Sequence, residues 1–165
     1  MNKKTRTMII SIISNISNYI EKITYILVEI TLVLMLSIGI VHVFCRYALN
    51  SSLSWTEEVL SYGLAYFSLL GASVVLKRKG HIGVVFIRDK MSNKMKEYFL
   101  KLSSIIELFV SLTVGITGII LMFQVKNQVT PALYISMAIP FFSVALSFIF
   151  MSIYALEHVI NDFCK

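Results

Sequence analysis

The chain has 165 residues, of which 57% are apolar and only 15% charged, and its mean hydropathy is +0.80. Soluble globular domains carry about 25% charged residues, so the composition excludes that class and indicates a membrane protein. The net charge of +6 comes from basic residues that flank apolar stretches, which is a signal of membrane topology and gives no reason to expect a nucleic acid partner.

Four apolar stretches are each long enough to cross a bilayer as a helix. A hydrocarbon core about 30 Å thick needs roughly 20 helical residues. The stretches are continuous rather than alternating, which excludes the strands of a membrane barrel. The sequence therefore predicts an all-α integral membrane domain over residues 23–156, with crossings at about 23–44, 59–76, 102–123 and 132–156.

Residues 1–22 precede the first crossing and have a basic tip. Serines and asparagines interrupt their apolar character, and no small-x-small cleavage pattern follows, so a cleaved signal peptide is rejected. Their isoleucines recur at helical spacing, which predicts an amphipathic helix along the membrane surface before the chain turns inward. We expect these residues to be a retained cytoplasmic lead-in.

The basic residues predict the orientation of the crossings. Cytoplasmic loops of membrane proteins retain Lys and Arg. All basic residues except Arg46 and Lys126 lie before the first crossing, around the connection between the second and third, or at the C-terminus. Both termini, including a short tail at residues 157–165, are therefore expected in the cytoplasm.

The connection between the second and third crossings combines lysines with apolar residues at helical spacing, a pattern typical of an interfacial amphipathic helix. We expect a short in-plane helix before Ser92, then one long helix that begins near Lys94 and continues through the third crossing. Basic side chains near an anionic leaflet contact its headgroups. The residues expected to contact phospholipid headgroups are Lys77, Arg78, Lys79, Lys90 and Lys94.

Small residues and one proline predict how the crossings pack and bend. In lipid, close backbone approach drives helix association, and small side chains share a stripe on three crossings. These stripes are Ser61, Ala65, Ser68 and Ala72; Ser104, Ser111, Gly115 and Gly118; and Ser136, Ser143 and Ser147. Pro140 lies within the fourth expected crossing, where its missing N–H predicts a kink.

Cysteines and histidines do not form a recognisable cofactor site in the sequence. Cys45 and Cys164 are expected on opposite sides of the bilayer, and no C-x-x-C occurs, which disfavours a disulfide catalyst. His42 is expected at the outer side, and His81 and His158 at the cytoplasmic side as isolated surface residues, so neither a bis-histidine haem nor a metal is expected. With no nucleophile motif either, the chain is not expected to be an enzyme.

Glu29 and Glu107 lie within crossings, at matching expected depth near the cytoplasmic edge. An acid in hydrocarbon is costly and marks a pathway, a proton relay or a partner. One interpretation is a stand-alone four-helix proton-coupled exporter that uses Glu29. Internal repeats and paired broken helices, which are usual in self-sufficient transporters, are absent from the sequence. A structural or subunit-contact role is therefore favoured for both acids.

A family resemblance rests on residues 45–84, which read CRYALNSSLSWTEEVLSYGLAYFSLLGASVVLKRKGHIGV. This order is similar to that of the DctQ family, the small membrane subunit of tripartite ATP-independent periplasmic (TRAP) transporters. There an Arg after helix 1 precedes W-x-E-E at helix 2, a Gly-Ala within it and a Gly-His-Ile after it. The matching positions are Arg46, Trp55, Glu57, Glu58, Gly71, Ala72, Gly80, His81 and Ile82. The later TPALYISMAIP resembles the family's start of helix 4, so the resemblance covers roughly residues 23–156.

The resemblance implies a non-catalytic subunit of the bacterial inner membrane. Such subunits scaffold a large membrane subunit that carries the substrate and sodium sites and is fed by a periplasmic substrate-binding protein. The substrates are acidic metabolites such as C4-dicarboxylates or sialic acid, and nothing in this chain selects between them. The residues expected in structural or partner contacts are Arg46, Trp55, Glu57, Glu58, His81, Glu29 and Glu107.

The paired acids at the start of the second crossing have two structural interpretations. Because the first loop is short, Arg46 is expected near Glu57 or Glu58 and can pair with one of them, with Trp55 as an anchor at headgroup level. Alternatively, both acids complement the dipole of the second helix. Direct contact with a partner by one acid is the third, less favoured, interpretation.

Overall fold

The computed structural model describes residues 3–51, 53–78 and 93–164. Regular structure in these ranges is helical, apart from an isolated bridge between Val129 and Ser136. The helices are α1 (Lys3–Ala48), α2 (Ser54–Lys77), α4 (Asn93–Val125) and α5 (Ala138–Cys164). Each is long and apolar enough to cross a membrane, which confirms the predicted all-α architecture with four spanning helices.

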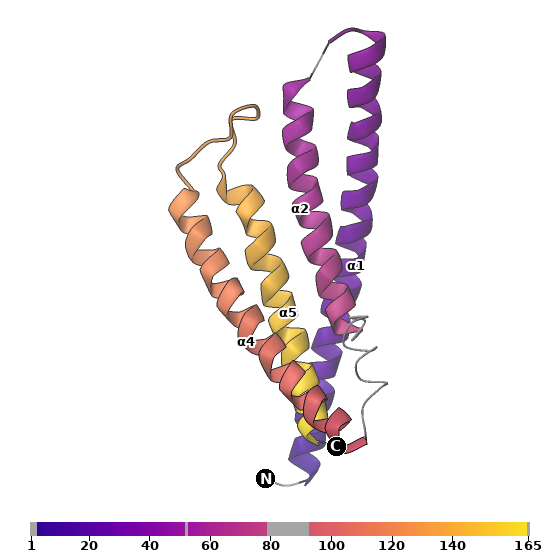
Figure 1. Ribbon diagram of the computed structural model, residues 1–165, viewed down its shortest axis with the longest axis vertical. Coiled ribbons are helices and arrows are strands. Elements are labelled where there is room, and N and C mark those ends of the chain that lie inside the picture. Colours follow the sequence, from indigo (N-terminus) through magenta and orange to yellow (C-terminus); the bar gives the residue numbers. More distant parts are fainter. Residues whose placement is uncertain (1–2, 52, 79–92, 165) are drawn as a thin grey trace.

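The helices form two antiparallel pairs, α1 with α2 and α4 with α5 (Figure 1). α1 begins and α5 ends at one end of the bundle, which we term the termini end. The α1–α2 and α4–α5 loops lie at the opposite end, the loop end. The pairs approach each other at the termini end and diverge toward the loop end (Figure 1). α5 contacts the three other helices, so the bundle is organised around it.

α1 is one uninterrupted helix, whereas the sequence analysis predicted a turn between residues 1–22 and the first crossing. No Pro or Gly precedes Gly39 in α1, so nothing in the backbone interrupts it there. Ser17 and Thr24 are fully buried, and the Thr24 hydroxyl lies 3.5 Å from that of Tyr154 in α5. The lead-in is therefore packed against the bundle, and its contact with a membrane surface stays a prediction.

The second predicted crossing begins earlier than expected, and the third begins where expected. α2 starts at Ser54 rather than near residue 59. α4 runs from Asn93 to Val125, as predicted for a helix that begins near Lys94 and continues through the crossing. The in-plane helix predicted before Ser92 lies outside the described residues.

The predicted kink at Pro140 is wrong because α5 begins only at Ala138. Pro140 thus lies in the first helical turn, where a backbone N–H has no intrahelical acceptor and its loss costs little. The preceding residues form a loop, in which the Tyr134 amide donates to the Thr130 carbonyl at 3.1 Å. At its other end α5 continues to Cys164, through most of the segment expected to be a tail.

Small residues pack α4 against α5, as predicted. A Cβ atom at Gly118 would lie 3.3 Å from the Ala145 backbone nitrogen, so the two backbones approach closely. Ser104 and Ser111 of α4 are buried as well. Ser143 and Ser147 are also buried, but each lies two residues from Ala145 and therefore on the other side of α5. The stripe predicted on α2 is wrong, because Ser61 and Ser68 are exposed and the buried side of α2 is formed instead by Leu70, Ser73, Val74 and Leu76.

Candidate functional site

Glu58 fastens α2 to the α4–α5 loop at the loop end. Its Oε1 accepts a hydrogen bond from the Tyr62 hydroxyl at 2.6 Å. Its Oε2 accepts from the backbone amides of Ala132 at 3.0 Å and Leu133 at 2.7 Å. Both carboxylate oxygens are thus used within the chain, and charge-assisted bonds of this kind are stronger than neutral ones.

Arg46 does not form the predicted pair with Glu57 or Glu58. Glu57 instead lies 3.9 Å from His42 Nε2, and His42 Nδ1 is hydrogen-bonded to the Thr56 hydroxyl. The first turn of α2 therefore meets α1 at His42, one turn before Arg46, whose side chain is exposed near the end of α1. Among the described residues, no hydrogen bond or ion pair joins Arg46 to either acid.

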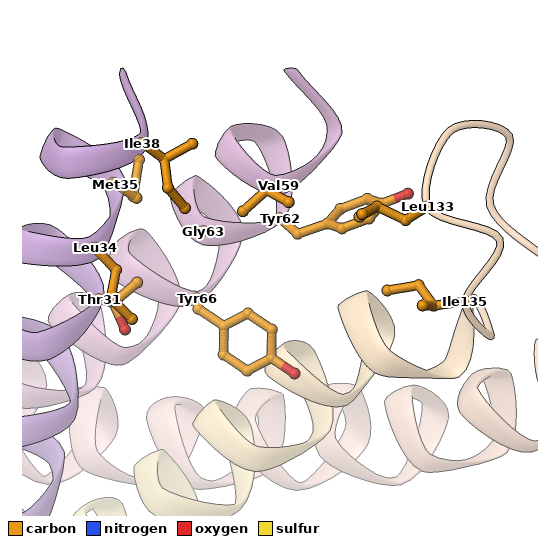
Figure 2. Close-up of a pocket in the computed structure, with 10 residues that line it drawn as sticks. All are labelled: Thr31, Leu34, Met35, Ile38, Val59, Tyr62, Gly63, Tyr66, Leu133 and Ile135. Carbon is orange, nitrogen blue, oxygen red and sulfur yellow. The ribbon is translucent and has the colours of Figure 1, made fainter. Parts of the chain in front are cut away.

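An apolar cavity of about 280 Å³ lies beside the Glu58 contact (Figure 2). It is lined by Thr31, Leu34, Met35 and Ile38 of α1, Val59, Tyr62, Gly63 and Tyr66 of α2, and Leu133 and Ile135 of the α4–α5 loop. Its Thr31 and Tyr66 hydroxyls donate to the carbonyls of Leu27 and Ile139, at 2.7 and 2.6 Å. The lining fits an acyl chain or an apolar side chain rather than a charged substrate.

A polar network joins the helices at the termini end. Lys77 at the end of α2 is ion-paired with Glu157 of α5, and each side chain is only 10% exposed. His158 Nε2 donates to the Lys77 carbonyl oxygen at 3.1 Å, while His158 Nδ1 lies 3.4 Å from Glu107 of α4. The Ser104 hydroxyl donates to Asp162 at 2.6 Å. Charged groups thus connect α2, α4 and α5.

This network corrects two sequence predictions. Lys77 was expected at the lipid headgroups, but its ammonium group is inside the bundle. His158 was expected to be an isolated surface residue, but it is 4% exposed. One feature of the sequence could have indicated this network. Glu157, His158 and Asp162 follow a long apolar run, at the same expected depth as the basic end of α2.

The other residues predicted at the headgroups are only partly described. Arg78 Nε donates to Glu21 at 2.9 Å, and the Arg78 side chain is 61% exposed, so it is accessible at the termini end. Lys94 lies in α4, but its side chain is outside the described residues. Lys79, Lys90 and the predicted partner residue His81 also lie outside them. Trp55 is exposed in the first turn of α2, and its role as an anchor stays a prediction.

The two membrane glutamates differ in their surroundings. Glu107 accepts a hydrogen bond from Ser103 at 3.1 Å and lies beside His158. Glu29 is exposed on α1, and no hydrogen bond or ion pair joins it to another described residue. Within the described ranges, no three His, Cys, Asp or Glu side chains are grouped as a metal site requires. The structure therefore leaves Glu29 as the membrane carboxylate that faces away from the bundle.

Comparison with known families identifies the chain. A family model described as tripartite ATP-independent periplasmic transporters, DctQ component, matches residues 23–165. The chain belongs to the DctQ family. This family is a transporter component rather than an enzyme, and membership confirms the resemblance drawn from residues 45–84.

Two relatives are components of sialic acid TRAP transporters. The chain is 30% identical over 77 residues to the small permease protein SiaQ of Vibrio cholerae, an alignment that covers 47% of this chain and 42% of SiaQ. It is 26% identical over 101 residues to the permease protein SiaT of Haemophilus influenzae, covering 59% of this chain and 16% of SiaT. The aligned segments thus span less than half of either relative.

Proposed function

We propose that this DctQ protein is the small subunit that scaffolds the large membrane subunit of a TRAP transporter. The transporter carries out sodium-coupled, binding-protein-dependent uptake of an acidic metabolite. The family match over residues 23–165 carries the proposal. The bundle supports it, because the charged and polar groups at the termini end contact one another. The cavity at the loop end is apolar, so neither region offers a site for an acidic substrate.

The alignment with SiaT supports a large permease as the partner. Only 16% of SiaT is similar to this chain, so in that relative the similar segment is joined covalently to a much longer permease protein. When the small subunit is a separate chain, as we propose here, it must bind the large permease through a non-covalent contact. Both relatives are named as sialic acid transporter proteins, which favours sialic acid over a C4-dicarboxylate as the substrate class.

The proposed location is the bacterial inner membrane, with both termini in the cytoplasm. The distribution of Lys and Arg supports this orientation. It places the α1–α2 and α4–α5 loops in the periplasm, where a substrate-binding protein delivers its ligand. The exposed Glu57 and Trp55 at this end are available for that transient contact.

A stand-alone proton-coupled exporter is disfavoured by the position of Glu29. A proton-coupled carboxylate must reach a pathway through the protein, whereas Glu29 faces outward from α1. An outward-facing Glu29 fits a contact with another chain better than a proton pathway.

Reconstitution tests the proposed function. The large permease encoded with this chain is placed in proteoliposomes with and without it, and sialic acid uptake is measured with a sodium gradient and the binding protein. We expect uptake only when both membrane chains are present, and co-purification of the two from detergent. Solute accumulation or export by this chain alone would overturn the proposal.

A further inference from the structure

α1 exposes a regular seam of side chains on its outward face. Its members are separated alternately by three and four residues, which is the spacing with which one helix packs along another. They are Ile26, Glu29, Val33, Leu36, Ile40 and Val43, all of them exposed. We term this set the α1 seam. It is apolar except for Glu29.

Contacts between α1 and α2 place Glu29 at the depth of the hydrocarbon. The ion pair between Glu21 and Arg78 marks one end of the helix pair, and the hydrogen bond between His42 and Thr56 marks the other. A rise of about 1.5 Å per residue puts these levels roughly 32 Å apart along α1, close to the thickness of a bilayer core. Glu29 lies about 12 Å inside the Glu21 level by the same rise.

Glu29 cannot escape the hydrocarbon by extending its side chain. Lys and Arg reach the interface through long aliphatic stems, but Glu has only two methylene groups. A carboxylate facing acyl chains is rare because nothing there solvates it, and such groups are almost always paired. The described part of the bundle supplies no such group, which favours a donor from a partner chain.

The remaining lipid-facing surfaces of the bundle are different. No exposed Asp, Glu, Lys, Arg or His lies within residues 59–76 of α2, 102–125 of α4 or 138–156 of α5. Those faces suit acyl chains along their whole central length. The α1 seam therefore combines helix-packing periodicity with a charge that lipid does not satisfy.

We propose that a transmembrane helix of the large permease packs on the α1 seam and presents a cationic or hydrogen-bond-donating side chain to Glu29. This inference rests on the proposed function, because it assigns a surface to the same partnership. A second copy of this chain in the same orientation would bring Glu29 against Glu29, which like-charge repulsion opposes. A single polar residue in an apolar seam fixes the register of two packed helices, so Glu29 sets the position of the partner helix.

Site-directed photo-crosslinking tests the surface. p-Benzoylphenylalanine is introduced in place of Val33 on the seam, or in place of Ile116 on α4, and the chain is co-expressed with the large permease. The two sites are matched, because Val33 is 61% and Ile116 58% exposed and both lie centrally in their spans. We expect a crosslink to the large permease from position 33 and none from position 116.

The other outcomes distinguish failure of the α1 seam proposal from failure of the proposed function. Crosslinking to the permease from position 116 alone, or to a second copy from position 33, would overturn the seam and leave the proposed function standing. Failure of the unmodified chain to co-purify with the permease would instead overturn the proposed function.

Substitution of Glu29 tests the charge itself. Glu29→Leu should lower the fraction of permease that co-purifies by about tenfold, because a buried donor on the partner loses its acceptor, whereas Glu29→Asp should retain much of it. The isolated Glu29→Leu chain should keep its yield and thermal stability, since Glu29 bonds to no described residue. Co-purification at the original level with Glu29→Leu would show that the carboxylate has no partner in the permease.

Discussion

Glu57 and Glu58 are adjacent in the sequence but have different roles in the structure. Successive residues of a helix point about 100° apart, so Glu58 faces the α4–α5 loop and holds its backbone amides, while Glu57 stays 63% exposed beside His42. The W-x-E-E motif therefore contains one acid that is hydrogen-bonded within the chain, Glu58, and one that is exposed, Glu57. Of the two acids, Glu57 is the one exposed enough to meet the periplasmic partner proposed above.

Lys77 and Glu157 form a buried ion pair whose members depend on each other. Lys77→Met should destabilise the bundle by about 3 to 5 kcal/mol, because it leaves a buried carboxylate unpaired. The double variant Lys77→Met with Glu157→Leu should regain most of that loss. Thermal unfolding of the purified chain in detergent measures both effects.

The adjacent Arg78 provides the control for this ion pair. Its bond to Glu21 is largely exposed, so Arg78→Met should cost no more than about 1 kcal/mol. Equal losses for the Lys77 and Arg78 variants, or a double variant no more stable than Lys77→Met, would contradict the buried-pair interpretation.

At the scale of elements, the α4–α5 contact is the most extensive helix pairing in the bundle. Gly115 and Gly118 bring α4 onto the backbone of α5 near Phe148 and Ala145. Apolar burial gives little driving force in lipid, so van der Waals contact between backbones holds such pairs together. The stripe of small residues on α2 looks the same in sequence, but its members Ser61 and Ser68 are exposed.

Gly118 allows a test of this packing. Gly118→Leu should destabilise the bundle by about 1 to 3 kcal/mol, because the new side chain would overlap the Ala145 backbone. Gly39→Leu on α1 is the matched control, since a Cβ there meets no atom within 4 Å. Thermal unfolding in detergent compares the two variants, and an equal response would argue against the close α4–α5 approach.

At the scale of the whole molecule, the two ends of the bundle are built differently. Two ion pairs and the contact between His158 and Glu107 join the converging helices at the termini end. At the loop end the helix pairs diverge (Figure 1), and an apolar cavity lies there (Figure 2). Glu58 connects α2 to the α4–α5 loop at the same end. Polar contacts therefore hold the helices together at the termini end. At the loop end, the apolar cavity can accept a lipid chain or an apolar side chain of a partner.

Orientation in the membrane is testable with single cysteines. In a chain with Cys45→Ser and Cys164→Ser, the exposed loop residue Asn127 is replaced by cysteine. A membrane-impermeant maleimide should label this site from the periplasmic side, because the positive-inside distribution puts the loop end outside. Exposed Lys22 at the termini end, replaced by cysteine in the same background, should label only after the membrane is opened. The reverse pattern would invert the proposed topology.

The sequence by itself determined the helical class, the four spans and the family. Hydropathy is a sum over contiguous residues, so a run of about 20 apolar residues predicts a crossing whatever the other helices of the bundle are. The stripe of small residues on α4 was also predictable, because the helical spacing of small residues can be recognised within a single segment of sequence. The ends of helices were harder to predict from the sequence. Pro140 suggested a kink within a helix, but α5 begins at Ala138, so Pro140 lies in its first turn.

Only the tertiary structure decided which charged groups satisfy each other. Lys77 and Glu157 are 80 positions apart in the sequence. Glu58 is 74 and 75 positions from Ala132 and Leu133, whose amides donate to it. Such pairs depend on the rotation of each helix about its axis and on the depth at which helices meet, and neither is encoded in one segment. The same geometry distinguished Glu107, held beside His158, from Glu29, left facing the membrane.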